Sequence, residues 1–143
     1  MLIEEYFQDI EKCVADCPYI TESQILKDKR SLYIGIIEGK IYFTDESILH
    51  FIEFVNVKEQ TEKYKYSYHY QSKDGKLIFR YDIAPHHKEI KTYPHHKHLG
   101  IAKVIKASEP CLAGVLGEIE EQIKLAIRGD LISRQIFDIL ITF

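Results

Sequence analysis

The chain has 143 residues, of which 45% are hydrophobic and 29% are charged, and its formal net charge at pH 7 is −3. This length and balance exclude a fibrous or disordered protein and predict one globular domain over residues 1–143. No apolar run reaches the roughly 20 residues that cross a bilayer, and the acidic N-terminal segment lacks the basic start of a signal peptide. We therefore expect a cytoplasmic protein without membrane contact.

The first half of the chain predicts one helix followed by several short strands. Apolar side chains recur at helical spacing over residues 2–14, which indicates an amphipathic helix. Strand-like runs follow at 19–26, 31–37, 40–44 and 47–55, with turns expected at "EGK" (38–40) and "DES" (45–47). The run at 47–55 is apolar almost throughout, as in a strand that is covered on both faces, so we expect His50 to be a buried core residue.

The next two runs, 63–71 and 76–82, alternate strictly and predict a β-hairpin with its turn at 72–75. A four-residue loop would pair Tyr70 with Leu77 and Tyr68 with Phe79. The aromatic face is then expected to join the core, although it also resembles a platform on which nucleic-acid bases stack. The polar face should carry Lys65, Ser67, His69, Arg80 and Asp82.

The second half holds a histidine-rich segment and a helical C-terminus. Pro85 and Pro94 favour an extended path for residues 83–98, and residues 101–108 predict one more strand. Ser108 is a candidate N-cap for a helix that should break at Gly129-Asp130, followed by a helical C-terminal extension over residues 130–143. The fold class is therefore α+β: a single domain with an antiparallel sheet of about five to seven strands, flanked by an N-terminal helix and one or more C-terminal helices.

Positive charge is concentrated in residues 63–106, which contain ten Lys or Arg and three Asp or Glu, a local charge of +7 in a chain whose remainder sums to −10. Five of the seven histidines lie at 86–98, four of them in two Pro-His-His-Lys copies. This pattern predicts an anion-binding site, and a lysine-rich solvated strand edge is the simpler alternative. The candidate substrate-binding residues are Lys65, His69, Lys88, Lys97 and Lys103.

The same residue types suit cleavage of RNA without a metal ion or other cofactor. A base must take the 2′-hydroxyl proton, an acid must protonate the leaving oxygen, and a cation must stabilise the phosphoryl oxygens. Histidine can fill both proton-transfer roles near neutral pH. Arg80 offers a planar fork to the scissile phosphate, and Asp82 is placed to orient a histidine. The candidate acid and base lie among His86, His87, His95, His96 and His98.

Three other interpretations stay open at this point. A catalytic metal would be bound by His86, His96 and His98, although this spacing matches no established ligand motif. A histidine acting as a transient nucleophile would support nucleotidyl or phosphoryl transfer. The basic segment would otherwise be a non-enzymatic binding module for an acidic partner protein or a nucleic acid, or the histidines would simply lie on the surface.

The segments "RYDIAPHH" and "PHHKH", which follow the hairpin "YSYHYQSKDGKLIFRYD", resemble the TumE-type toxin family of prokaryotic toxin–antitoxin systems. The resemblance covers about residues 1–125, and Ile83 stands where the family pattern has Asn. It implies a small toxin that inhibits growth, and a cognate antitoxin that binds DNA and is encoded by a neighbouring gene. RNA is the expected substrate, and a homodimer is one expected assembly.

Overall fold

The computed structural model describes residues 1–83, 95–100, 103–106 and 109–142. These residues form two helices and seven strands, so the predicted α+β class and strand number are confirmed. The elements in chain order are α1 (Ile3–Ala15), β1 (Ile20–Lys29), β2 (Ile34–Phe43), β3 (Ile48–Asn56), β4 (Glu62–Gln71), β5 (Leu77–Ile83), β6 (His95–Leu99), β7 (Lys103–Lys106) and α2 (Leu112–Thr142).

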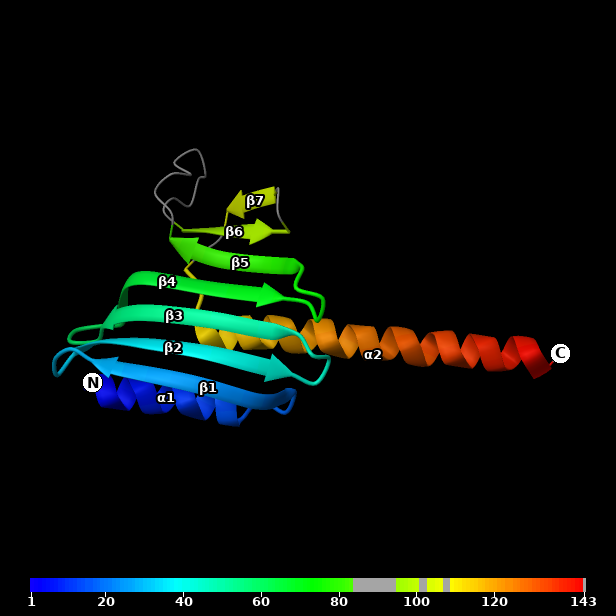
Figure 1. The fold of residues 1–143 in the computed structure, drawn as a ribbon, viewed down its shortest axis with the longest axis horizontal. Helices are drawn as coiled ribbons and strands as arrows, with labels where there is room; N and C mark the ends of the chain where they lie inside the picture. The colour runs from blue at the N-terminus through cyan, green and yellow to red at the C-terminus, as the bar shows by residue number, and fades with distance from the viewer. Residues whose placement is uncertain (84–94, 101–102, 107–108, 143) are drawn as a thin grey trace.

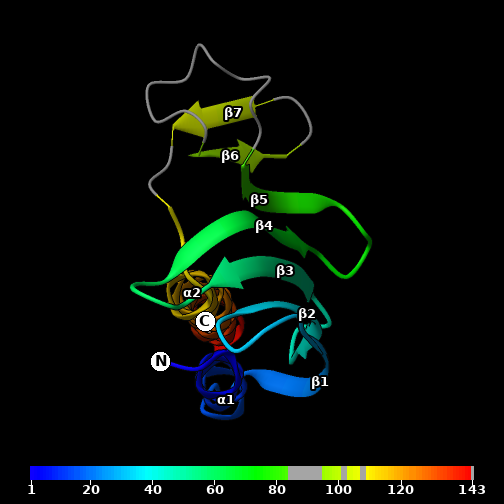
Figure 2. The same ribbon diagram turned by 90° about the vertical axis from the view of Figure 1, so that its left-hand side faces the viewer.

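The seven strands form one antiparallel sheet in which each strand pairs with the next along the chain (Figure 1). Both helices lie on the same side of this sheet, as the turned view in Figure 2 shows. The sheet therefore has a helix-covered face, on which the core is built, and an open face. Within the described residues no helix or strand packs over the open face.

The core forms because strands and helices each send one set of apolar side chains to the covered face. The helix α1 contributes side chains at the spacing expected of an amphipathic helix, and α2 does the same only over its first three turns. Aromatic side chains of β4 and β5 fill the centre of the sheet, which confirms the predicted aromatic core. The most deeply buried of these side chains are Tyr66, Tyr68, Tyr70 and Phe79.

The predicted pairing of the hairpin was wrong by two residues. Ser72 and Lys76 close a three-residue loop whose Gly75 has a φ of 84°, and a bulge next to Tyr70 shifts the ladder again. Tyr70 therefore pairs with Phe79, and Tyr68 pairs with Tyr81. A shift of two residues keeps each side chain on its predicted face, because the strand repeat is two.

A second bulge, where β3 pairs with β4, changes which of the first residues of β4 face the core. The bulge falls between Phe54 and Val55 and turns Lys63 toward the core, whereas Tyr64 is 45% exposed. The strict alternation of residues 63–71 therefore predicted the wrong face of the sheet for Tyr64. The core-facing position is occupied instead by a buried lysine.

Three further expectations were wrong. The residues "EGK" are inside β2, because Gly39 allows the ring of Phe51 to lie against the strand, and they do not form a turn. His50 is on the open face, where its side chain is 54% exposed. The helix α2 continues through Gly129 and Asp130, because one exposed glycine costs a helix only about 1 kcal/mol. The proposed cap at Ser108 lies outside the described residues.

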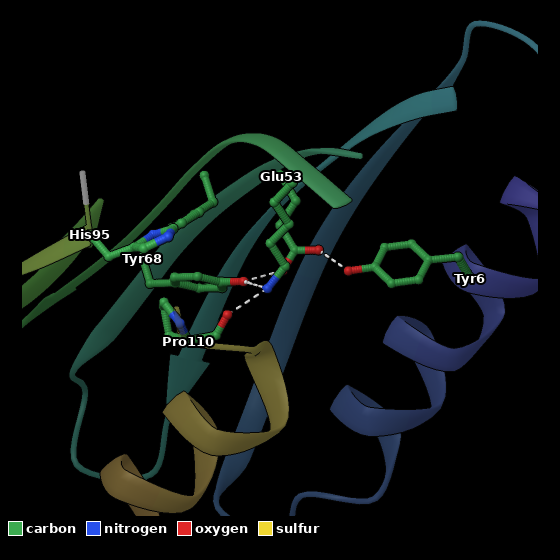
Figure 3. Close-up of polar contacts among 7 residues, drawn as sticks. Tyr6, Glu53, Tyr68, His95 and Pro110 are labelled. Carbon is green, nitrogen blue, oxygen red and sulfur yellow. Dashed lines mark hydrogen bonds and ion pairs between the residues drawn. The ribbon is translucent and has the colours of Figure 1, made fainter. Parts of the chain in front are cut away.

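A buried polar cluster joins both helices to the sheet, as Figure 3 shows. Glu53 is fully buried and accepts hydrogen bonds from the hydroxyls of Tyr6 and Tyr68. Lys63 Nζ lies 3.6 Å from Glu53 and donates to the Pro110 carbonyl at 2.6 Å, just before α2 begins. This cluster gives a buried carboxylate and a buried ammonium their hydrogen-bond and charge partners.

In the described part of the chain, neither helix is long and apolar enough to span a bilayer.

Candidate functional site on the open face of the sheet

The polar side chains of the central strands meet on the open face. His69 of β4 pairs with Arg80 of β5, and Arg80 pairs in turn with His98 of β6. Asp82 is two residues from Arg80 and therefore lies on the same face. Residues that are up to 29 positions apart in the sequence thus form one group, because three consecutive strands are paired in this register.

Asp82 connects the arginine and the histidine of this group. Its Oδ2 accepts a hydrogen bond from Arg80 Nε at 3.0 Å, and its Oδ1 lies 3.5 Å from His98 Nε2. The side chain of Asp82 is 14% exposed, whereas that of Arg80 is 41% exposed. The carboxylate is thus held inside the group, and the guanidinium is accessible to a ligand. Asp82 therefore holds the arginine and the imidazole next to each other on the open face.

His69 is in a different electrostatic environment. Partial burial lowers the pKa of His69 below its ordinary value, and the positive charge of Arg80 lowers it further. A hydrogen bond to Gln71 acts in the opposite direction, and His50 contributes a smaller lowering. The His69 ring is therefore mainly neutral near pH 7, the state in which a histidine can accept a proton.

A cleft of about 630 Å³ lies on the open face beside this group. It extends from Arg80 across β4 and β3 to β2, and apolar side chains of Ile48 and Ile52 form part of its lining. This volume is in the range of sites that hold a small organic ligand rather than a single ion. The polar side chains that line the cleft are Lys40, His50, Lys65, Ser67, His69, Gln71 and Arg80.

Two predicted site residues of β6 lie on the covered face instead. His95 stacks on the ring of Tyr66, and its Nδ1 is 2.9 Å from the Tyr66 hydroxyl. Lys97 lies over the ring of Tyr81 at 4.7 Å and donates a hydrogen bond to Glu118 of α2. Burial lowers the pKa of Lys97, but the contacts with Glu118 and Tyr81 outweigh it, so the pKa is raised overall. Both side chains attach β6 to the core.

The remaining predicted residues are placed only in part. His86, His87 and Lys88 lie outside the described residues. The backbone of His96 pairs with Asp82, and that of Lys103 pairs with Leu99. Among the residues that the structure describes, no three His, Cys, Asp or Glu side chains are close enough together to hold a metal ion.

Lys40 and His50 are members of the cleft that the sequence reasoning missed. The sequence predicts that Lys40 lies where a turn ends and a strand begins, and that His50 lies in the core. The available signal was alternation: Leu49, Phe51, Glu53 and Val55 are the buried set of β3, which leaves His50 on the other face. The apolar residues Ile48 and Ile52 on that other face hid this alternation.

Comparison with known proteins agrees with the resemblance found in the sequence. No curated protein and no solved structure matches the chain. The family model described as Toxin TumE matches residues 10–123. This segment contains all seven strands, the group around Arg80 and the buried part of α2. The chain therefore belongs to the TumE toxin family.

Proposed function

We propose that this toxin is a ribonuclease that cleaves RNA at the open face of the sheet, without a metal ion, by proton transfer between histidines and the substrate. Arg80 binds the scissile phosphate, and Asp82 holds both Arg80 and His98 in place. Membership of a toxin family implies an antitoxin partner in general. We further propose that this antitoxin is a DNA-binding protein.

The observation that carries this proposal is the group of Arg80, Asp82 and His98. The carboxylate of Asp82 contacts both the guanidinium and the imidazole, at 3.0 Å and 3.5 Å. An arginine that is fixed at one edge keeps its other N–H groups available for phosphoryl oxygens. The same carboxylate is placed to stabilise the positive charge on His98 whenever that ring holds a proton. His98 therefore fits the role of the general acid.

The second proton-transfer role fits His69. It pairs with Arg80 on the neighbouring strand, so a phosphate bound to Arg80 lies close to both histidines. Its lowered pKa keeps the ring unprotonated at neutral pH, as a base for the 2′-hydroxyl requires. His86, His87 and His96 remain candidates for either role.

Incubation of the purified protein with total RNA, with and without EDTA, tests this function. The parent protein should cleave RNA equally in both conditions. Arg80→Ala and His98→Gln should each reduce the initial rate by about 100-fold or more, because each removes a group that stabilises the transition state. Arg30→Ala is a matched control: this arginine is 56% exposed and pairs with Asp28 away from the cleft, so its cleavage rate should stay at the parent level.

Thermal unfolding of each variant separates a lost function from a lost fold. A folded Arg80→Ala protein that cleaves RNA at the parent rate would contradict the proposal. Cleavage that EDTA abolishes and that added metal restores would contradict the metal-independent chemistry. Salt-sensitive RNA binding without cleavage by the parent would instead identify a non-enzymatic binding module.

A further inference from the structure

The side chains that line the cleft continue beyond the group around Arg80 as a row across five strands. Lys40 of β2 pairs with His50 of β3, which pairs with His69 of β4. His69 pairs with Arg80 of β5, and Arg80 pairs with His98 of β6. We call these five residues the basic row. Since neighbouring strands are about 4.8 Å apart, the row spans about 20 Å.

We infer that the basic row is a track for single-stranded RNA, in which Lys40 and His50 bind a phosphate group next to the one that Arg80 binds. Because the track serves the substrate proposed above, it rests on the proposed function. A single phosphate group is too small to contact the whole row. Several successive phosphate groups of one RNA strand are long enough to do so.

The charges along the cleft favour a polyanion. Its lining contains three cations, Lys40, Lys65 and Arg80, and, among the described residues that line it, no carboxylate. Two carboxylates lie beside it: Asp82 Oδ2 accepts a hydrogen bond from Arg80 Nε at 3.0 Å, and Glu38 Oε1 is 2.8 Å from His50 Nε2. The Glu38 and His50 side chains are both about half exposed, so this pair contributes little free energy. A phosphate can therefore displace Glu38 from His50.

The apolar part of the lining favours a nucleic acid over an acidic protein segment. Ile48 and Ile52 flank His50 on the open face, so apolar side chains lie on both sides of the basic row. A nucleic-acid strand offers a charged backbone with flat apolar bases beside it. An acidic peptide offers the charges without the bases, and would leave these two isoleucines uncovered.

Equilibrium binding to the full-length protein tests the track without relying on cleavage. The probes are a fluorescent oligoribonucleotide of about eight nucleotides and the matching dinucleotide, both with 2′-O-methyl riboses that cannot be cleaved through the 2′-hydroxyl. Lys40→Ala and His50→Gln should each weaken binding of the longer probe by about five-fold. Lys40→Ala should also reduce the salt dependence of binding by about one phosphate contact. Binding of the dinucleotide should not change.

A variant that should tighten binding and a matched control that should leave it unchanged make the test more specific. Glu38→Gln removes the competing carboxylate and should tighten binding of the longer probe. Lys76→Ala removes a lysine from the hairpin turn, where its side chain is 84% exposed and outside the cleft, and should leave the affinity unchanged. The track is overturned if Lys40→Ala and His50→Gln bind the longer probe like the parent, or if both probes weaken equally. It is also overturned if a Glu-rich peptide displaces the RNA more effectively than an unlabelled oligoribonucleotide.

These outcomes are separate from those of the cleavage test. Loss of binding in Lys40→Ala without any cleavage by the parent would contradict the ribonuclease and leave an RNA-binding track. Normal cleavage together with unchanged binding in Lys40→Ala would contradict the track alone.

Discussion

At the scale of single residues, Glu53 contributes to stability in a way that only the folded structure explains. Its carboxylate is fully buried on the covered face, where the hydroxyls of Tyr6 and Tyr68 donate hydrogen bonds to it. Burial raises the pKa of both tyrosines, and the charge of Glu53 raises it further, so both hydroxyls keep their protons and remain donors. Lys63 supplies the opposite charge.

Replacing Glu53 with Gln should destabilise the protein by about 3 kcal/mol, because it leaves the buried ammonium of Lys63 without its counter-charge. Urea unfolding, followed by circular dichroism, measures this change in the free energy of unfolding. Tyr6→Phe removes one hydrogen bond and should cost only about 1 kcal/mol.

The control for this prediction is Glu4→Gln. Glu4 pairs with Lys29 at 2.6 Å, but the Glu4 side chain is 58% exposed, so this substitution should cost well under 1 kcal/mol. Equal costs for Glu53→Gln and Glu4→Gln would mean that the buried pair contributes no more than a surface pair.

At the scale of elements, the close approach of β2 and β3 depends on a glycine. Gly39 pairs with Phe51, and a Cβ atom at Gly39 would lie 2.2 Å from the Phe51 ring. That ring is fully buried and stacked on Tyr68, so it has little room to move. Gly39 therefore maintains a continuous strand.

Gly39→Ala should destabilise the protein by about 1–3 kcal/mol through overpacking. Gly117→Ala provides a comparison with the opposite sign: Gly117 is exposed in α2, a Cβ there would meet no neighbour within 4 Å, and alanine should stabilise the helix by up to about 1 kcal/mol. Urea unfolding of both variants measures the difference. A stabilising Gly39→Ala would show that Phe51 moves aside without cost.

The elements that depend on local patterns could be predicted from the sequence. The period of the apolar residues indicated α1, and alternation assigned both faces of β5 and most of β4, including Arg80 and His69. The pairing of the hairpin depended on a bulge beside Tyr70, which responds to packing across the sheet and leaves no mark in the local pattern. The strand β6 was missed for a related reason: its His-His-Lys-His sequence has no apolar alternation, and its two faces are defined only by pairing with β5.

The sequence predicted which types of residue form the open-face site, but not how these residues are arranged in space. Arg80, Asp82 and His98 were named because arginine, aspartate and histidine suit phosphate chemistry. The exclusion of His95 from this face, and the addition of Lys40, required the order and register of the strands. Pairing between strands that are far apart in the sequence decides which side chains share the open face, and the local sequence pattern does not contain this pairing.

At the scale of the whole molecule, α2 has two different halves. Its first part packs under the sheet through Leu112, Leu116, Ile119 and Ile123, all of which are buried. The rest extends beyond the sheet, as Figure 1 shows, and carries exposed apolar side chains such as Ile132 and Leu140. The match to the family ends at residue 123, where the buried half ends.

Removal of residues 129–143 should therefore leave the folded unit intact. The expected change in the free energy of unfolding is less than about 1 kcal/mol, because exposed positions contribute little to it, and the cleavage rate should not change. Ile119→Ala is the contrasting variant inside the buried half, and it should cost about 2–5 kcal/mol. Urea unfolding at several protein concentrations measures both. A loss of several kcal/mol on truncation would contradict this division, and a loss that grows with protein concentration would indicate that the second half of α2 binds another copy of the chain.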